Sequence, residues 1–270
     1  DGLSEVLIAD NLRPELDSES LVPARRQLAW LYEHIRLASL GGYPDLSQWG
    51  TGGITPTATA IGNVIRFLSE ATGDKGILGV DVGSMSTVLA ASFGNDLALT
   101  VQPDVGVGHS AARLLTHTRL DHISRWLPED FSDDEVRNYL YNKSLAPATV
   151  PHELRELYLE HALARQCLQV VAGAARPSWS NKAQASYGGL MPPFDTIIGS
   201  GAVLARAPRP GQAALMMIDG LQPLGVTSLT LDAHGALPAV GAAATQNPVA
   251  AVQVLQSNSF PGLGLVVSLV

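Results

Sequence analysis

Short continuous apolar runs recur along the chain, each bounded by glycine, proline or an acidic residue, and such runs predict buried strands. Three of them follow one another closely, and Gly94-Asn95-Asp96 separates the second from the third as a hairpin turn. These three runs predict an antiparallel meander. The full set of predicted strands covers residues 5–9, 76–82, 86–93, 97–101, 194–198, 227–231 and 263–269.

Other segments carry apolar residues at intervals of three and four, a spacing that predicts amphipathic helices. Pro23 in a first turn and Gly41-Gly42 after a last turn bound one of them. The segments 43–53 and 174–192 show no such periodicity and are predicted to be loops. The predicted helices cover residues 24–40, 56–70, 110–118, 120–126, 132–145, 151–172, 210–221, 237–245 and 248–255.

This order of elements predicts an α/β fold in which helices flank a mixed sheet. A meander followed by alternating helices and strands suits a ribonuclease H-like domain, the building block of actin-like ATPases. We expect residues 1–270 to form a single lobe of this kind, with residues 110–192 as a mainly helical insertion on its flank.

Composition narrows the possible partners. Hydrophobic residues make up 46% of the chain and charged residues 16%, which allows a large core, and the net charge of −8 opposes binding to nucleic-acid backbones. No apolar run reaches the roughly 20 residues of a transmembrane helix, and the first residues lack the pattern of a signal peptide. We therefore expect a cytoplasmic protein with neither nucleic-acid nor membrane partners. The single cysteine, Cys167, is expected to be a small buried residue inside a helix.

The first segment with candidate chemistry runs from Asp81 to Thr87, at the end of a predicted buried strand. Backbone N–H groups of a turn at Gly83 and Ser84 can hold a phosphate, and an aspartate at the rim of a sheet can hold Mg²⁺ through water. The same residues also suit an ordinary hairpin turn in which the aspartate bonds its own backbone. The motif taken alone leaves both interpretations open.

The second segment, Gly199-Ser200-Gly201-Ala202, follows a predicted buried strand and precedes helical sequence. A glycine turn at this position lets a ligand approach the backbone closely. It is also typical of a turn that packs a helix tightly against a strand.

Together, and in this order, the two segments resemble the phosphate and adenosine motifs of the actin, Hsp70 and sugar kinase superfamily. Further segments narrow the resemblance to the MutL-type family associated with glutamate mutase, which is unrelated to the mismatch-repair protein of the same name. The resemblance covers nearly the whole chain. The segments that carry it are Val6-Leu7-Ile8-Ala9-Asp10-Asn11, Ile54-Thr55-Pro56-Thr57-Ala58, Asp104-Val105-Gly106-Val107-Gly108-His109-Ser110-Ala111 and Gly199-Ser200-Gly201-Ala202-Val203-Leu204.

The resemblance implies a protein whose two lobes enclose ATP or ADP with Mg²⁺. It also implies an accessory or reactivating role for an adenosylcobalamin-dependent mutase of the glutamate mutase type. Asp81 and Asp104 are the candidate catalytic carboxylates, and Asp81 is also the candidate Mg²⁺ ligand. The nucleotide is expected at Gly83, Ser84, Ser86, Thr87, Gly199, Ser200, Gly201 and Ala202.

The chain departs from the pattern of this family at two positions. Ser84 and Val88 stand where the family commonly shows a second glycine and a closing aspartate. A single Asp-x-Gly loop is present, and we assign it to the second of the two phosphate loops, so that the chain is the C-terminal lobe and an N-terminal lobe completes the site. Because the closing carboxylate is lost, we expect at most a weak ATPase in the intact protein and an inactive isolated lobe.

Two other functions remain open at this point. A hydantoinase-like or kinase-like ATP-dependent enzyme would use the same loops, with Asp81 or Asp104 as the base. A scaffold that binds no nucleotide is favoured by Ser84 and Val88.

Two further patterns are not predicted to be sites. Gly106-Val107-Gly108 partly matches a dinucleotide fingerprint, but the strand before it belongs to a meander and not to a βαβ unit. His109, His117 and His122 lack a recognised spacing of metal ligands and are predicted to lie on helix surfaces.

Overall fold

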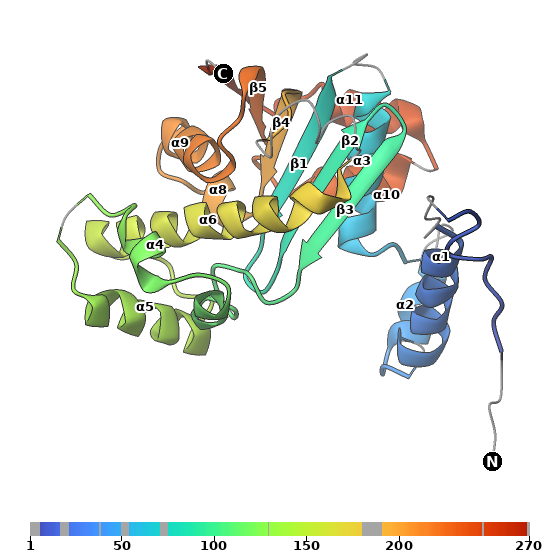
Figure 1. Ribbon diagram of the computed structural model, residues 1–270, viewed down its shortest axis with the longest axis horizontal. Helices are drawn as coiled ribbons and strands as arrows, with labels where there is room; N and C mark the ends of the chain where they lie inside the picture. The colour runs from blue at the N-terminus through green and yellow to red at the C-terminus, as the bar shows by residue number, and fades with distance from the viewer. Residues whose placement is uncertain are drawn as a thin grey trace. The chain divides into compact units, whose positions relative to one another are not determined.

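The computed structural model of the chain describes residues 6–16, 22–37, 39–49, 54–70, 75–128, 130–179, 191–244 and 246–268 (Figure 1). Contacts divide the chain into two compact units, residues 1–54 and residues 55–270.

The first unit is helical where it is described. Helix α1 (Val22–Leu31) continues into a π-helical segment (Tyr32–Leu37), which confirms most of the helix predicted over 24–40. Helix α2 (Tyr43–Gln48) lies within the segment 43–53, so the prediction of a loop there was wrong over its first half. Gly42 precedes α2 with φ 83°, and Pro44 in the first turn favours the helix.

The strand predicted over residues 5–9 was also wrong for its described residues. Residues 6–9 form no strand, and Val6 and Ile8 are 71% and 85% exposed. An apolar run becomes a strand only when a neighbouring strand pairs with it and a layer covers it, and this segment has neither within the described residues.

The second unit is built on one six-stranded sheet in the order β3-β2-β1-β4-β5-β6 (Figure 1). Strands β1, β2 and β3 form the predicted antiparallel meander. Strand β4 lies parallel to β1, β5 lies parallel to β4, and β6 closes the sheet antiparallel to β5. The strands are β1 (Gly76–Val82), β2 (Thr87–Phe93), β3 (Asp96–Gln102), β4 (Phe194–Ser200), β5 (Gly225–Leu231) and β6 (Gly262–Ser268).

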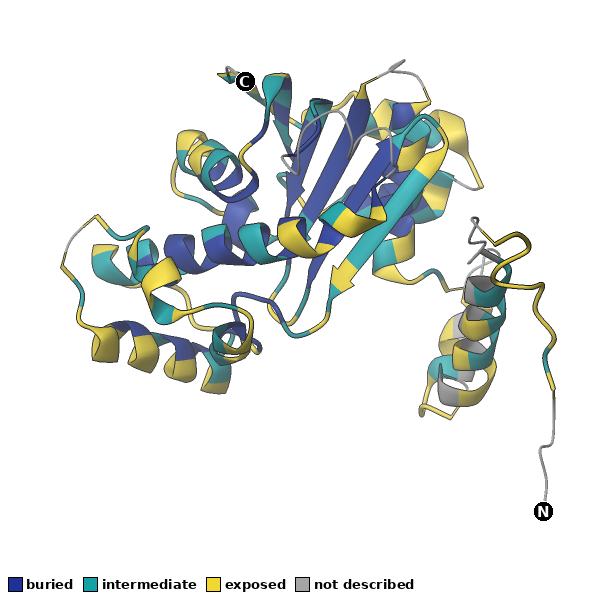
Figure 2. Ribbon diagram, in the orientation of Figure 1, coloured by how far each residue is buried: buried dark blue, intermediate teal, exposed yellow. Residues whose placement is uncertain are grey.

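Helices cover both faces of this sheet. Helices α6 (Leu154–Ala175) and α9 (Pro210–Leu221) pack on one face, in the core that contains Leu78, Val80 and Val82 of β1. The other face is covered by α3 (Thr57–Ser69), α10 (Leu237–Ala244) and α11 (Pro248–Leu255), in a separate core with Ile77. Figure 2 shows the central strands buried between these layers. The predicted mixed sheet flanked by helices is therefore confirmed.

The segment after the meander is mainly helical and extends beside α6. A 3₁₀ helix (Ala112–Thr116) lies within the helix predicted over 110–118. Helix α4 (Leu120–Ser124) follows, and then α5 (Asp133–Leu145), which begins with a capping box between Ser132 and Glu135.

The ends of the predicted loop over residues 174–192 differ from expectation. Helix α6 runs to Ala175 and a 3₁₀ turn (Arg176–Ser178) continues it. Residues 180–190 of that loop lie outside the described part of the chain. A further short helix, α8 (Ala202–Ala205), follows the glycine turn and was not predicted.

Candidate functional site at the carboxyl edge of the sheet

Three parallel strands end at the same edge of the sheet, and each ends in a polar residue. Asp81 near the end of β1 pairs in register with Ser200 at the end of β4, and Asp232 directly follows β5. The carboxyl ends of parallel strands are where ligands commonly bind in α/β proteins. The Asp81 hairpin and the glycine turn at Gly199, the two segments where the nucleotide is expected, therefore lie at one edge of the sheet.

The three polar side chains interact with one another. The Ser200 hydroxyl donates a hydrogen bond to Asp232, with Oγ and Oδ2 3.0 Å apart. Burial raises the pKa of Asp81 above its ordinary value; a hydrogen bond with Ser200 lowers it in part, and the charge of Asp232 raises it again. Asp81 thus has less tendency to ionise than an exposed aspartate.

Asp232 is a residue that sequence analysis missed. Its side chain is fully buried, and its carboxylate also accepts hydrogen bonds from the N–H groups of Ala236 and Leu237, each at 2.8 Å. It therefore fixes the start of α10 and orients the Ser200 hydroxyl at the same time. The signal was present, because Asp232 follows a buried strand and precedes a glycine turn, as Asp81 does.

Gly201 holds the glycine turn against β1. Its φ is 103°, in the region that favours glycine, and an added Cβ would collide with the carbonyl oxygen of Val82. The glycine is therefore required by the close approach of two backbones. Gly199 lies inside β4, and Ala202 beyond the turn is exposed.

The hairpin turn between β1 and β2 contains backbone N–H groups that, among the described residues, are not used in hydrogen bonds to other backbone groups. The Gly83 N–H donates to the Ser86 carbonyl oxygen at 3.0 Å and closes the turn. Within the described part of the chain, the N–H groups of Ser84, Met85 and Ser86 donate to no other backbone group. Free N–H groups in a turn can bind an anion.

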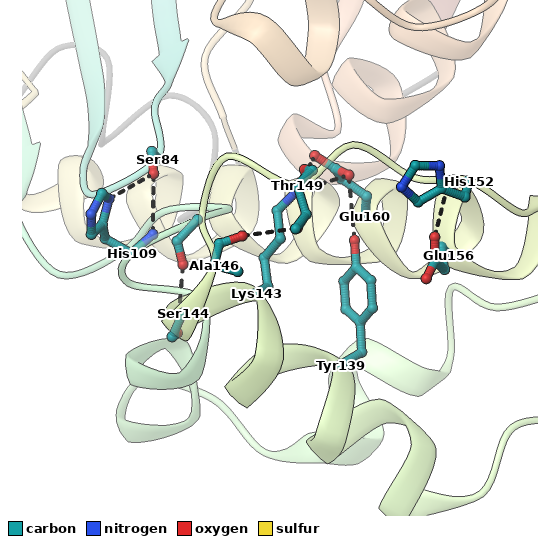
Figure 3. A network of polar contacts seen from close by, with 11 residues as sticks. Ser84, His109, Tyr139, Lys143, Ser144, Ala146, Thr149, His152, Glu156 and Glu160 are labelled. Atoms are coloured by element: carbon teal, nitrogen blue, oxygen red, sulfur yellow. Dashed lines mark hydrogen bonds and ion pairs between the residues drawn. The ribbon is translucent and has the colours of Figure 1, made fainter.

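The segment from Gly106 to Ser110 wraps this turn. The N–H groups of Gly108 and Ser110 donate to the Ser84 carbonyl oxygen at 2.9 and 3.3 Å. The His109 N–H donates to Ser84 Oγ at 3.1 Å, and His109 Nδ1 shares a further hydrogen bond of 3.1 Å with that hydroxyl (Figure 3). A Cβ on Gly106 would come within 2.6 Å of the Ser84 carbonyl oxygen. The two glycines thus permit close packing against the turn, in agreement with the rejection of a dinucleotide motif.

Two predicted site residues have their polar groups engaged within the fold. Thr87 is fully buried, and its hydroxyl donates to the Val105 carbonyl oxygen at 2.8 Å. Asp104 accepts from His117 Nε2 at 3.0 Å, and this contact lowers the pKa of the Asp104 carboxyl. Gly83 and Ser84, unlike Thr87, border a pocket.

The three neighbouring histidines do not form a metal centre. His117 contacts Asp104, His109 contacts Ser84, and His122 shares a hydrogen bond with Thr118. The expectation that they lie on helix surfaces holds for His122 in α4, whereas His109 lies in a loop. No group of three or more potential metal ligands is found in the described part of the chain.

A pocket of about 620 Å³ opens beside the hairpin turn, on the α6 face of the sheet. It is bounded by Gly83 and Ser84 on one side, by Ala202 and Arg206 on another, and by α6 and the loop before it. Sequence analysis did not single out the polar residues on its helical wall, which are Lys143, Glu160 and His161.

The wall of this pocket contains a buried ion pair between two helices. Lys143 of α5 lies 3.2 and 3.3 Å from the Glu160 carboxylate oxygens of α6 and donates to the Thr149 carbonyl oxygen at 2.6 Å (Figure 3). The Tyr139 hydroxyl donates to Glu160 at 3.3 Å, and burial raises the pKa of that hydroxyl. Both charges are satisfied within the protein.

A second pocket, of about 230 Å³, lies on the other side of the glycine turn. Asp81, Ser200 and His234 line it, and Ala202 and Arg206 line both pockets. The hairpin turn, the glycine turn and the two pockets therefore lie along one edge of the sheet.

Comparisons with known proteins identify the family. A search of curated proteins finds no relative that matches the chain. Within the described residues, no helix has both the length and the apolar character needed to cross a membrane. A model of the family described as MutL protein matches residues 1–259. The chain belongs to the MutL protein family, as its resemblance over nearly the whole chain predicted.

Proposed function

We propose that this chain is the nucleotide-binding lobe of an accessory or reactivating protein for an adenosylcobalamin-dependent mutase of the glutamate mutase type. The observation that carries the proposal is the pairing of Asp81 with Ser200 across β1 and β4, which sets the hairpin turn and the glycine turn side by side. Membership of the MutL family supports the link to the mutase.

The topology of the sheet supports a ribonuclease H-like, actin-type lobe. The order β3-β2-β1-β4-β5, with an antiparallel meander and parallel β1, β4 and β5, is the arrangement that such a lobe requires. A shared fold does not fix a function, so the nucleotide must be argued from the site itself.

The phosphates of an adenine nucleotide would lie on the free N–H groups of Ser84 to Ser86. The adenosine would lie past Ala202 in the 620 Å³ pocket, whose volume is within the range typical for small-molecule sites. Arg206 borders this pocket and provides a positive charge beside it. Three of the predicted site residues would not contact the nucleotide through their polar groups, because these groups are bonded inside the fold. Instead, these residues would hold the two turns in place; they are Gly199, Ser200 and Thr87.

Asp81 is suited to hold a Mg²⁺ ion that the phosphates of the nucleotide also bind. Mg²⁺ usually keeps several waters and takes one or two carboxylates together with phosphate oxygens. Asp81 is partly buried at the rim of the sheet, while the carboxylate of neighbouring Asp232 is occupied by three hydrogen bonds. When bound, the ion would neutralise phosphate charge, and Asp81 would orient one of its waters.

The carboxylates are poorly arranged for rapid hydrolysis. Asp104 is engaged by His117, and burial already disfavours the charged form of Asp81. We therefore propose a nucleotide-responsive accessory protein with at most weak ATPase activity, completed by its N-terminal lobe. A hydantoinase-like or kinase-like enzyme would need a free carboxylate base near the phosphates.

Calorimetric titration of the intact protein with Mg²⁺ and ADP tests the nucleotide site. Met85→Glu places a negative charge on the exposed turn and should weaken ADP binding about tenfold, because like charges repel at short range. Val249→Glu, on exposed α11, is the matched control and should bind as the wild type does. If the wild type does not bind ADP, the proposal is wrong and a scaffold that binds no nucleotide is the remaining function.

Phosphate release from ATP tests the accessory role. Release that is slow in the isolated intact protein and changes when a glutamate mutase-type enzyme is added supports the proposal. Rapid phosphate release that does not change when the mutase is added would instead support a hydantoinase-like or kinase-like enzyme.

A further inference from the structure

His161 stands apart from the other polar residues on the wall of the 620 Å³ pocket. It lies one helical turn after Leu157 on α6, and it is only 6% exposed. Within the described part of the chain, its imidazole makes no hydrogen bond or ion pair, whereas adjacent Glu160 is bonded to Lys143 and Tyr139. Buried polar groups are normally hydrogen-bonded, so an unpartnered one on a pocket wall points to a ligand that supplies the partner.

We propose that His161 is a specificity-determining residue that hydrogen-bonds to the polar edge of a nucleobase bound in this pocket. The proposal rests on the proposed function, because the phosphate-binding turn at Gly83 and Ser84 borders the same pocket and sets the direction of the nucleotide.

The surroundings of His161 suit a flat, uncharged ring. Much of the wall is apolar, and Lys143 and Glu160 neutralise each other there, so neither charge is available to a ligand. Among the described residues of α5 and α6 that line the pocket, His161 is then the buried polar side chain without a hydrogen-bond partner in the protein. The apolar lining residues that would contact the faces of the ring are Pro147, Ala148, Val150, Leu154 and Leu157.

The protonation state of the imidazole agrees with this role. Burial, together with the nearby charge of Arg165, lowers the pKa of His161 to about 4. The ring is therefore neutral near pH 7 and offers one donor nitrogen and one acceptor nitrogen. Such a ring can bond to a base edge, which carries donors and acceptors, but it has no charge with which to attract a phosphate.

The test compares two ligands on variants of the intact protein. His161→Leu removes the hydrogen bond at similar volume, and His161→Gln keeps polar capacity at the same place. We expect His161→Leu to weaken ADP binding roughly tenfold, the ratio for one hydrogen bond, with partial recovery in His161→Gln. Binding of inorganic pyrophosphate should be unchanged in both. His122→Leu, on α4 outside the pocket, is the matched control.

The outcomes separate this inference from the proposed function. If ADP binds to His161→Leu as tightly as to the wild type, the role of His161 is wrong and nucleotide binding stands. Equal weakening of ADP and pyrophosphate would indicate a structural role and overturn the inference. If the wild type binds neither ligand, the proposed function and the inference both fall.

Discussion

The Ser200 hydroxyl donates to Asp232 Oδ2 at 3.0 Å while it also faces Asp81 across the pairing of β1 and β4. One hydroxyl carries one proton, and because Ser200 gives it to Asp232, the effect of Ser200 on Asp81 offsets only part of the effect of burial. The charge of Asp232 is satisfied by two backbone N–H groups as well, and Asp81 is left as the less stabilised carboxylate. This asymmetry explains why burial and the neighbouring charge can raise the pKa of Asp81.

Replacing Asp81 should therefore stabilise the protein at neutral pH. A carboxyl whose pKa is raised on folding is protonated more readily in the folded state, so its ionisation opposes folding as pH rises above the ordinary value of 3.8. Asp81→Asn cannot ionise, and we expect a higher melting temperature than the wild type at pH 7. The difference should shrink as the pH approaches 3.8.

Thermal unfolding at both pH values measures this effect. Asp96→Asn removes an exposed carboxylate at the start of β3 and should match the wild type throughout. A lower melting temperature for Asp81→Asn at pH 7 would show that the ionised carboxylate is stabilised by contacts that the structure does not contain. If the same variant also loses Mg²⁺-dependent nucleotide binding, Asp81 lowers the stability of the protein but is needed for its function.

His161 gives a pH dependence in the opposite direction. Its pKa is lowered on folding from 6.5 to about 4, so the unfolded chain takes up a proton that the folded chain refuses. Stability should fall as the pH decreases through this range, by about 3 kcal/mol in total if the full difference is realised. Above pH 6.5 the ring is neutral in both states and contributes no pH dependence.

Urea unfolding of His161→Leu between pH 7 and pH 4 checks this prediction. The variant should lose less stability on acidification than the wild type, whereas His122→Leu should follow the wild type. Parallel curves for the wild type and His161→Leu would mean that the imidazole becomes protonated without leaving its place in the pocket wall.

The wrapping of the hairpin turn can be tested with alanine at its two glycines. A Cβ on Gly108 would meet the side chain of Ser84, with the Ser84 Cβ at 2.9 Å, whereas a Cβ on Gly106 would meet the Ser84 backbone. Gly108→Ala and Gly106→Ala should each destabilise the protein by about 2 kcal/mol through overpacking.

Adding Ser84→Gly distinguishes the two positions. It should recover part of the loss in Gly108→Ala, because the obstructing side chain is gone, and none in Gly106→Ala. Denaturation midpoints of the wild type, the three single variants and the two double variants supply a double-mutant cycle for each glycine. Equal recovery at both positions would show that the turn moves as a whole.

Patterns local in sequence predicted much of the fold. The strands of the second unit and the meander followed from apolar runs and turn residues, and Asp81 and Gly199 met at one edge because parallel strands end together. The strand predicted at Val6 to Ala9 failed because pairing is a tertiary property. Asp232 carried the same signal as Asp81 and could have been predicted from it.

The pocket could not be read from the sequence. The periodicity of helix α6 separates a buried from an exposed side, but it does not reveal that His161 lies on a pocket wall or that Glu160 meets Lys143 of another helix. Thr87 was predicted to contact nucleotide because hydroxyls near a phosphate turn commonly do. Its β-strand alternation instead directs the hydroxyl to the Val105 carbonyl oxygen.

The segment that wraps the hairpin turn connects this turn with helix α5. The Gly108 N–H bonds to the Ser84 carbonyl oxygen, and the Ser144 hydroxyl near the end of α5 lies between the Gly108 carbonyl oxygen and the Ala112 N–H, at 3.5 and 2.9 Å. An anion that binds to the turn and displaces it would thus displace α5 as well, through the backbone of Gly108 and the Ser144 hydroxyl. The position of α5 would then depend on whether the anion is bound, and a protein that docks on the surface of α5 would respond to that difference.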